Sequence, residues 1–291
     1  MRRVIFHVGP EKTGSTLVQA YFALNQDAIR DAGGKRVAFF GPAAVRDSGL
    51  LSEAQTIVGG GQGPIPGLAS LLSQAGDAST VIVSHESLFG HPDTAGFYGS
   101  EGGRRTLIHR MIAGSAECGE FVFYYKQPHK LIESYYRHHV MHGGKLAPMD
   151  YLERVPLLKM SFVEFKEDLE SLAGADRVKM LDARIQDADA FFRRFCAALD
   201  LVIEKHALAV PAQTNKSWSA LKTELSRIAN AKMAPAERSG WLRAMAAIPL
   251  GESSDAPMVP RIVTDLVERV YRDEHQKLMS QLADKIPESV S

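Results

Sequence analysis

The sequence predicts an α/β fold with a central parallel sheet, and two observations carry that prediction. Over residues 1–205, short apolar runs rich in β-branched and aromatic residues alternate with amphipathic segments of helical period. Such alternation is typical of parallel strands joined by helices that flank the sheet. Beyond residue 205 the apolar residues keep helical spacing, so residues 206–291 are expected to add helices to this core. Because no linker-like stretch separates the two parts, we expect a single domain over residues 1–291.

Each strand is expected where a short apolar run ends in a turn or loop signal. The five expected strands are 4–8, 36–40, 80–84, 120–126 and 177–181. The expected helices are 16–31, 43–57, 68–75, 104–113, 128–141, 144–175, 189–201, 221–230, 236–247 and 259–282. Two loops rich in glycine, 58–67 and 88–103, lie between these elements, and their role is left open.

The composition disfavours several classes of protein. Lysine plus arginine and aspartate plus glutamate both number 34, so the net charge is zero, which disfavours a nucleic-acid-binding protein. Cys118 and Cys196 form neither a disulfide framework nor a zinc pattern. No run approaches the roughly 20 apolar residues of a membrane span, and the run after Arg3 is too short for a signal peptide. We therefore expect a cytoplasmic protein without a transmembrane segment, whose oligomeric state the sequence does not reveal.

The most informative stretch joins the first strand to the first helix. The strand ends at Val8, and Gly9-Pro10 separates it from the helical spacing that follows. Small residues occupy the start of the helix, namely Gly14, Ser15 and Thr16. Backbone N–H groups at a helix N-terminus lack partners, and the helix dipole favours negative charge there. The stretch therefore predicts a loop that holds a phosphate-like anion.

This loop is close to a Walker A motif but differs from it in the position of the lysine. Gly9 and Gly14 have the Walker spacing and Thr16 follows, yet Ser15 stands where the lysine belongs. The lysine is Lys12, inside the loop. A nucleoside triphosphate kinase needs its lysine on the β- and γ-phosphates and a magnesium ion held by a carboxylate. The displaced lysine and the lack of a strand-end aspartate for magnesium count against a P-loop kinase-like phosphotransferase dependent on ATP, which is kept as one alternative. A turn that only joins the strand to the helix, without binding an anion, is another.

At Lys12-Thr13-Gly14-Ser15-Thr16, with Gln19 one turn further on, the sequence resembles the 5′-phosphosulfate-binding loop of sulfotransferases that use 3′-phosphoadenosine 5′-phosphosulfate (PAPS). The resemblance implies a P-loop-like three-layer fold that binds a phosphosulfate in place of a triphosphate. It implies PAPS as co-substrate and adenosine 3′,5′-bisphosphate as product, with these five loop residues around the 5′-phosphosulfate. Lys12 is expected to neutralise charge that develops on the bridging oxygen in the transition state.

A second segment resembles the 3′-phosphate-binding segment of the same sulfotransferases, where a strand ends in Arg-Asp-Pro and a serine follows eight residues after the arginine. Here Lys126 stands for the arginine, Gln127 for the aspartate, and Ser134 for the serine. A lysine supplies a point charge for phosphate but lacks the bidentate fork of arginine. Arg137 lies three residues after Ser134 on the same helix face and is a candidate to compensate.

The expected strand 80–84 is followed by His85 and Glu86, and the carboxyl ends of parallel strands share one crevice, so both are expected near Lys12. Sulfuryl transfer to a hydroxyl requires a base. Several sulfotransferase families place a glutamate after the second core strand, which Glu86 matches, whereas other families use a histidine, which makes His85 the rival. Neighbouring residues at a strand end point in opposite directions, so one of the two is expected to face the acceptor. The alternative is structural, with Glu86 capping a helix that starts at Ser87.

These residues together predict a PAPS-dependent sulfotransferase that transfers a sulfuryl group to a hydroxyl or amine of a small-molecule, carbohydrate or lipid acceptor. The acceptor itself is not readable, but four aromatic residues are candidates to line its cleft: Phe89, Phe97, Tyr98 and Trp218. No metal is expected, because no cluster of ligands has metal spacing, and the pair His138 and His142 lacks an HExxH glutamate. A non-catalytic nucleotide-binding protein is the third alternative.

Overall fold

The computed structural model describes residues 2–91, 98–116, 118–185, 187–204, 208–211, 218–248 and 257–283. The chain forms two compact units, each assembled from separate stretches of sequence. Unit 1 comprises Met1–Lys126, Lys159–Thr214 and Gln276–Ser291, and unit 2 comprises Gln127–Leu158 and Asn215–His275. The single domain expected from the sequence stays a prediction. Within the described ranges, no helix is long and apolar enough to cross a membrane.

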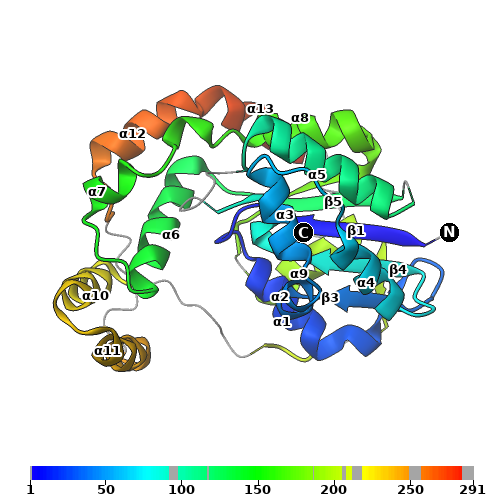
Figure 1. Ribbon diagram of the computed structural model, residues 1–291, viewed down its shortest axis with the longest axis horizontal. Coiled ribbons are helices and arrows are strands. Elements are labelled where there is room, and N and C mark those ends of the chain that lie inside the picture. Colours follow the sequence, from blue (N-terminus) through cyan, green and yellow to red (C-terminus); the bar gives the residue numbers. More distant parts are fainter. Residues whose placement is uncertain are drawn as a thin grey trace. The chain divides into compact units, whose positions relative to one another are not determined.

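Unit 1 is built on a five-stranded sheet in which all neighbouring strands run parallel. Its strands in spatial order are β3 (Val37–Phe40), β4 (Thr80–Ser84), β1 (Arg3–Val8), β5 (Gly119–Tyr125) and β6 (Val178–Asp182). The α/β fold with a central parallel sheet is thus confirmed, together with its five strands. The strand β1 lies in the centre, between β4 and β5 (Figure 1). Because these strands are parallel, the loops that follow them emerge at one edge of the sheet.

Helices cover both faces of this sheet and make the fold three-layered (Figure 1). On one face lie α1 (Ser15–Asn25) and α9 (Ala188–Ala198). On the other face lie α5 (Glu101–Gly114) and α8 (Phe162–Ala173). The shorter elements of unit 1 are α2 (Pro42–Asp47), α3 (Leu50–Val58), α4 (Pro66–Gln74) and the 3₁₀ turns η1 (Gln26–Ala28), η2 (Glu86–Phe89) and η4 (Ala175–Arg177).

Alternating strand residues supply the two halves of the core, since successive side chains of a strand point to opposite faces. Ile5 belongs to an apolar cluster with Phe22 of α1 and Phe192 of α9. The next residue, Phe6, packs on the other face, where its ring stacks on Phe121 with the centroids 5.3 Å apart. The core side chains of the strands on both faces of the sheet are almost completely buried, which explains why the strands are continuous apolar runs in the sequence.

Two short strands differ from the sequence expectation. The strand β2 (Ile29–Asp31) pairs antiparallel with β7 (Leu201–Ile203). The helices expected over 16–31 and 189–201 were therefore predicted too long, because each ends before one of these strands. Val202 and Ile203 are β-branched and suit a strand, whereas Ile29–Asp31 becomes a strand through its pairing with this distant segment.

Three segments expected as single helices are each divided: 43–57, 144–175 and 259–282. The first divides at Gly49, where φ is 87°. The pieces besides α2, α3 and α8 are α7 (Pro148–Leu152), η3 (Leu157–Lys159), α12 (Arg261–Val270) and α13 (Arg272–Ala283). Within 144–175, Pro156 stands between α7 and η3, a helix-breaking residue that the expected single helix did not take into account.

Unit 2 is helical and is held together by buried polar contacts. Its helices are α6 (Pro128–Met141), α10 (Ala220–Lys232) and α11 (Pro235–Ala247), besides α7 and α12. The Nδ2 of Asn230 on α10 donates to the carbonyls of Val140 and Gly144, both at 2.9 Å. The carboxylate of Glu133 on α6 accepts the backbone N–H of Val259 at 2.7 Å. These contacts tie α6 to segments that are distant in sequence.

Candidate functional site

The loop between β1 and α1 has the geometry of an anion-binding turn. Lys12 and Gly14 have positive φ angles of 66° and 103°, and left-handed residues in a turn bring successive N–H groups to one side. Thr13 closes the turn by donating from Oγ1 to the carbonyl of Pro10 at 2.9 Å. Among the residues that the structure describes, the backbone N–H groups of residues 12–16 donate to no other group. The loop thus presents a set of unused donors at the N-terminus of α1, where negative charge is favoured.

Packing explains the glycines at both ends of this loop. A Cβ on Gly14 would lie 2.6 Å from Cζ of Phe191 in α9, well inside ordinary contact distance. A Cβ on Gly9 would lie 3.1 Å from Cβ of Phe123 in β5. Both glycines also have φ angles above 100°, which residues with a side chain rarely adopt. The glycine spacing of the motif therefore follows from the close approach of the loop to β5 and α9.

Lys12 places a cation beside these donors. Burial lowers the pKa of its ammonium, and the carboxylates of Glu11 and Glu86 oppose that change. Within the described part of the chain, this ammonium makes no hydrogen bond or ion pair, and the hydroxyls of Ser15 and Thr16 make no hydrogen bond. A partly desolvated cation attracts an anion more strongly than one in bulk water. Lys12 is therefore suited to balance the charge of an anion held by the loop.

Lys126 brings a second cation to the same loop. It directly follows β5, which neighbours β1 in the sheet. Its Nζ donates to the backbone carbonyl of Lys12 at 3.1 Å. The two lysines expected at different phosphates of one ligand are thus linked through the backbone of the loop.

The first residue after β4, His85, has a structural role. It is buried, and its Nδ1 accepts the backbone N–H of Ser87 at 3.1 Å, so His85 and not Glu86 caps η2. Burial lowers the pKa of His85, with Glu86 opposing the shift and Arg46 adding to it. A neutral imidazole that accepts through Nδ1 carries its proton on Nε2 and has no lone pair left for a substrate proton. This geometry disfavours His85 as the base.

Glu86 is held on one side and open on the other. Its Oε2 accepts from Nε2 of Gln19 in α1 at 2.9 Å. Its Oε1 makes no hydrogen bond to any other described residue. The side chain is half-buried, and its charge acts on Lys12 across the loop. A carboxylate with one open oxygen beside an anion-binding loop can accept a proton from a group bound there.

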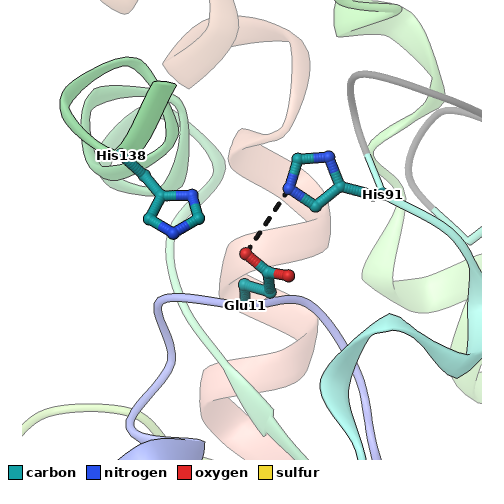
Figure 2. A group of neighbouring side chains, drawn as sticks. All are labelled: Glu11, His91 and His138. Carbon is teal, nitrogen blue, oxygen red and sulfur yellow. Dashed lines mark ion pairs between the residues drawn. The ribbon is translucent and has the colours of Figure 1, made fainter. Parts of the chain in front are cut away.

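Glu11 was not singled out from the sequence, although it lies inside the loop. Its Oε1 accepts from Oγ of Ser87 at 2.8 Å, and its Oε2 lies 3.4 Å from Nε2 of His91 (Figure 2). Both partners follow β4, so this carboxylate fastens the loop after β1 to the segment after β4. The available signal in the sequence was its position between Gly9 and Lys12. Its partners become apparent only when β1 and β4 are known to be neighbours.

The other expected phosphate ligands belong to α6 of unit 2. Ser134 is half-buried, and its Oγ donates to the carbonyl of Lys130 at 3.0 Å. Arg137 donates to the carbonyl of Trp218 and lies 3.8 Å from the carboxylate of Glu133. Unit 1 thus gathers the expected residues of the loop and of the ends of β4 and β5, and the roles of all these residues, like those of Ser134 and Arg137, stay predictions.

The aromatic residues expected to line an acceptor cleft lie in the interior where the structure describes them. Phe89 is 1% exposed and Tyr98 is 4% exposed, and both rings contact Phe165, at centroid distances of 5.2 and 4.4 Å. Trp218 is buried in unit 2, and Phe97 lies outside the described residues. Phe89 and Tyr98 therefore belong to the core, and the expectation that they line a cleft was wrong.

The structure is similar to two solved structures of sulfotransferases. One is a sulfotransferase from Alicyclobacillus acidocaldarius, with 15% identity over 86% of this chain and 98% of that chain, at a TM-score of 0.47. The other is the sulfotransferase domain from the curacin biosynthetic pathway, with 12% identity over 94% of this chain and 98% of that chain, at a TM-score of 0.38. No protein-family model and no curated protein matches the chain. At this level of similarity, the activity has to be inferred from the residues of the site.

Proposed function

We propose that this protein is a sulfotransferase that uses PAPS as its sulfuryl donor. The observation that carries the proposal is the loop of residues 12–16, whose N–H groups and Lys12 ammonium have no partner among the described residues. The resemblance of its sequence to 5′-phosphosulfate-binding loops favours a phosphosulfate over other anions. In this proposal, the backbone of Thr13 and Gly14 and the hydroxyls of Ser15 and Thr16 cradle the 5′-phosphosulfate.

In the proposed reaction, the acceptor oxygen forms a bond to sulfur while the bond between sulfur and the bridging oxygen of PAPS breaks. Glu86 takes the proton of the acceptor hydroxyl on Oε1 as that oxygen attacks. The electron pair of the broken bond leaves with the 5′-phosphate of adenosine 3′,5′-bisphosphate, and Lys12 stabilises the charge that develops there. The products are the sulfated acceptor and the bisphosphate, and Glu86 then returns its proton to water.

Lys126 is proposed to bind the 3′-phosphate from the end of β5. Its link to the backbone of Lys12 supports this role, because one ligand in contact with both lysines would order the loop as it binds. Ser134 and Arg137 remain candidate ligands through the sequence resemblance. The acceptor is proposed to carry a hydroxyl or an amine, on a small molecule, a carbohydrate or a lipid.

Calorimetric titration with adenosine 3′,5′-bisphosphate tests the proposal without knowledge of the acceptor. We expect the bisphosphate to bind, and Lys12→Ala or Lys126→Ala to weaken binding by about tenfold or more, since each removes a charge-assisted contact to phosphate. Ser134→Ala tests the remaining 3′-phosphate prediction. Lys35→Ala, which removes an exposed lysine of the turn before β3, serves as the control and should bind like the wild type.

The same titration with ATP and magnesium distinguishes the main alternative. A chain that binds magnesium-ATP and does not bind the bisphosphate would be a kinase-like phosphotransferase, and the sulfotransferase proposal would fail. A chain that binds the bisphosphate, but whose Glu86→Gln and Lys12→Ala variants keep full biological activity, would be a non-catalytic nucleotide-binding protein.

A further inference from the structure

We propose that Gln19 is a positioning residue that orients the carboxylate of Glu86, an inference that rests on the proposed function of Glu86 as the base. Gln19 lies on α1, one turn beyond the anion-binding loop. Its Nε2 donates to Oε2 of Glu86 at 2.9 Å and to Oγ of Ser84 at 3.2 Å. One amide group therefore bridges the last residue of β4 and the residue that is to accept the substrate proton.

A buried hydrogen-bond chain fixes the orientation of this amide. Ser84 is fully buried, and its Oγ lies 2.9 Å from Nδ1 of His7 on β1. His7 and Ser84 are register partners in the parallel ladder between β1 and β4, so the backbone sets their spacing. The Oγ of Ser84 is therefore in hydrogen-bond contact with both the amide of Gln19 and the ring of His7, and these two contacts fix the position of the amide.

The neutral ring of His7 is the last member of this hydrogen-bond chain. Its side chain is 1% exposed, and its ring contacts Phe195 and Tyr124 at steep angles, with centroids 5.0 and 5.8 Å away. Burial lowers the pKa of His7 to about 3, so the ring carries no charge near neutral pH. The hydrogen-bond chain from His7 through Ser84 to Gln19 therefore transfers no charge. Its effect is to orient the amide of Gln19.

The fixed amide determines which oxygen of Glu86 is available. With Oε2 held by Gln19, Oε1 is the oxygen that can accept a proton from a bound hydroxyl. A general base has to lie within hydrogen-bond reach of that proton, so a small rotation of the carboxylate reduces the rate. A misplacement of about 1 Å from the productive geometry can cost on the order of 10²-fold in rate.

Three variants separate orientation from packing. Gln19→Met keeps the length of the side chain and removes the N–H donor. Gln19→Glu keeps the shape and places a second carboxylate against Glu86. Ser84→Ala removes the hydroxyl that accepts a hydrogen bond from the Gln19 amide. Its matched control is Ser115→Ala, which also removes a buried serine hydroxyl. The hydroxyl of Ser115 donates to the carbonyl of Ile112 at 2.8 Å and is not connected to Glu86.

The first measurement is a double-mutant cycle of Gln19→Met and Glu86→Met in urea unfolding, which needs neither cofactor nor acceptor. We expect the two substitutions to be non-additive, with a coupling of about fivefold in the unfolding equilibrium constant, as found for residues in one hydrogen-bond network. The cycle of Ser115→Ala with Glu86→Met should be additive. An additive Gln19–Glu86 cycle would overturn the proposal.

The second measurement is turnover, followed as release of adenosine 3′,5′-bisphosphate from PAPS with water, phenol and glucose as acceptors. We expect kcat to fall roughly tenfold in Gln19→Met and further in Gln19→Glu, with the Kd for the bisphosphate unchanged. Wild-type kcat in both variants would show that Gln19 only packs. If the wild type neither binds nor turns over these nucleotides, the proposed function fails, and the unfolding cycle still decides whether Gln19 holds Glu86.

Discussion

At the residue scale, hydrogen bonding distinguishes Glu86, the candidate base, from its neighbour and rival His85. His85 uses its Nδ1 lone pair to cap η2, whereas Glu86 keeps Oε1 open among the described residues. The sequence could place both residues at the end of a strand, because apolar runs mark strand ends well. It could not assign their roles, since these depend on a backbone N–H two residues further on and on a side chain of α1.

This difference predicts opposite outcomes for two conservative variants. Glu86→Gln removes the base and should lower the rate of sulfuryl transfer by about 10²- to 10⁴-fold, with unchanged binding of the bisphosphate. His85→Asn keeps an oxygen that can cap η2 and should stay within a few-fold of wild type. Initial rates and calorimetry on the two variants check this. Loss of activity in His85→Asn with a normal unfolding midpoint would reverse the assignment.

His7 predicts how stability changes with pH. Its pKa is about 3 in the folded chain and about 6.5 when unfolded, so the unfolded chain binds the extra proton between these values. The stability linked to neutral His7 is therefore complete above pH 6.5 and declines as pH falls toward 3. When the pH is lowered from 7 to 5, the unfolding free energy of both proteins is expected to fall. Because His7→Phe has no imidazole to protonate at this position, its fall should be about 2 kcal/mol smaller than that of the wild type. Urea unfolding at both pH values checks this, with the exposed His109→Gln as the control.

At the scale of elements, the join between β1 and α1 depends on glycine at position 14. Gly14→Ala would need a positive φ of 103° and a Cβ 2.6 Å from Phe191. Gly34→Ala is the matched control, because its φ is 74° but nothing lies within 4 Å of the added Cβ. We expect the control to lose about 1–2 kcal/mol of unfolding free energy from the backbone alone, and Gly14→Ala to lose about 1–3 kcal/mol more from the contact. Equal losses in urea unfolding would show that Phe191 moves aside freely.

Helices and strands could be predicted where the residues within them carry the signal for that structure. The strand Thr80–Ser84 and the helix Pro128–Met141 were found at their observed bounds, because burial gives a continuous apolar run and Pro128 marks a helix start. The sequence predicts the end of a helix at Ile29–Asp31, which is a strand in the structure. Its pairing with Leu201–Ile203 is a contact between distant segments, and the residues carry no local mark of it.

At the scale of the whole molecule, a ligand that binds only the folded chain has to stabilise it. Adenosine 3′,5′-bisphosphate at 100 times its Kd should raise the unfolding free energy by about 2.7 kcal/mol. At the same concentration, adenosine 5′-monophosphate should raise it less, because it lacks the 3′-phosphate proposed for Lys126. Thermal unfolding with each nucleotide checks this. Equal shifts with the two nucleotides would argue against a 3′-phosphate site.

The strand order explains how much of the site the sequence could predict. The loop of residues 12–16 is contiguous, so its glycines and lysine could be recognised together. The links of Gln19 to Glu86 and of Glu11 to Ser87 depend on β1 and β4 lying side by side, which no local pattern records. Site residues that are contiguous in the sequence could therefore be predicted, whereas the contacts between distant segments that orient them could not.

Because Lys12 has a left-handed backbone conformation, selection for folding stability and selection for the proposed activity favour different residues at position 12. Folding favours glycine or asparagine at a φ of 66°, whereas the proposed chemistry requires an ammonium. In a library randomised at this codon, sorting by protein abundance should enrich glycine and asparagine, and sorting by sulfuryl transfer should enrich lysine. Opposite rankings in the two sorts would mark position 12 as a site where function keeps a residue that lowers stability.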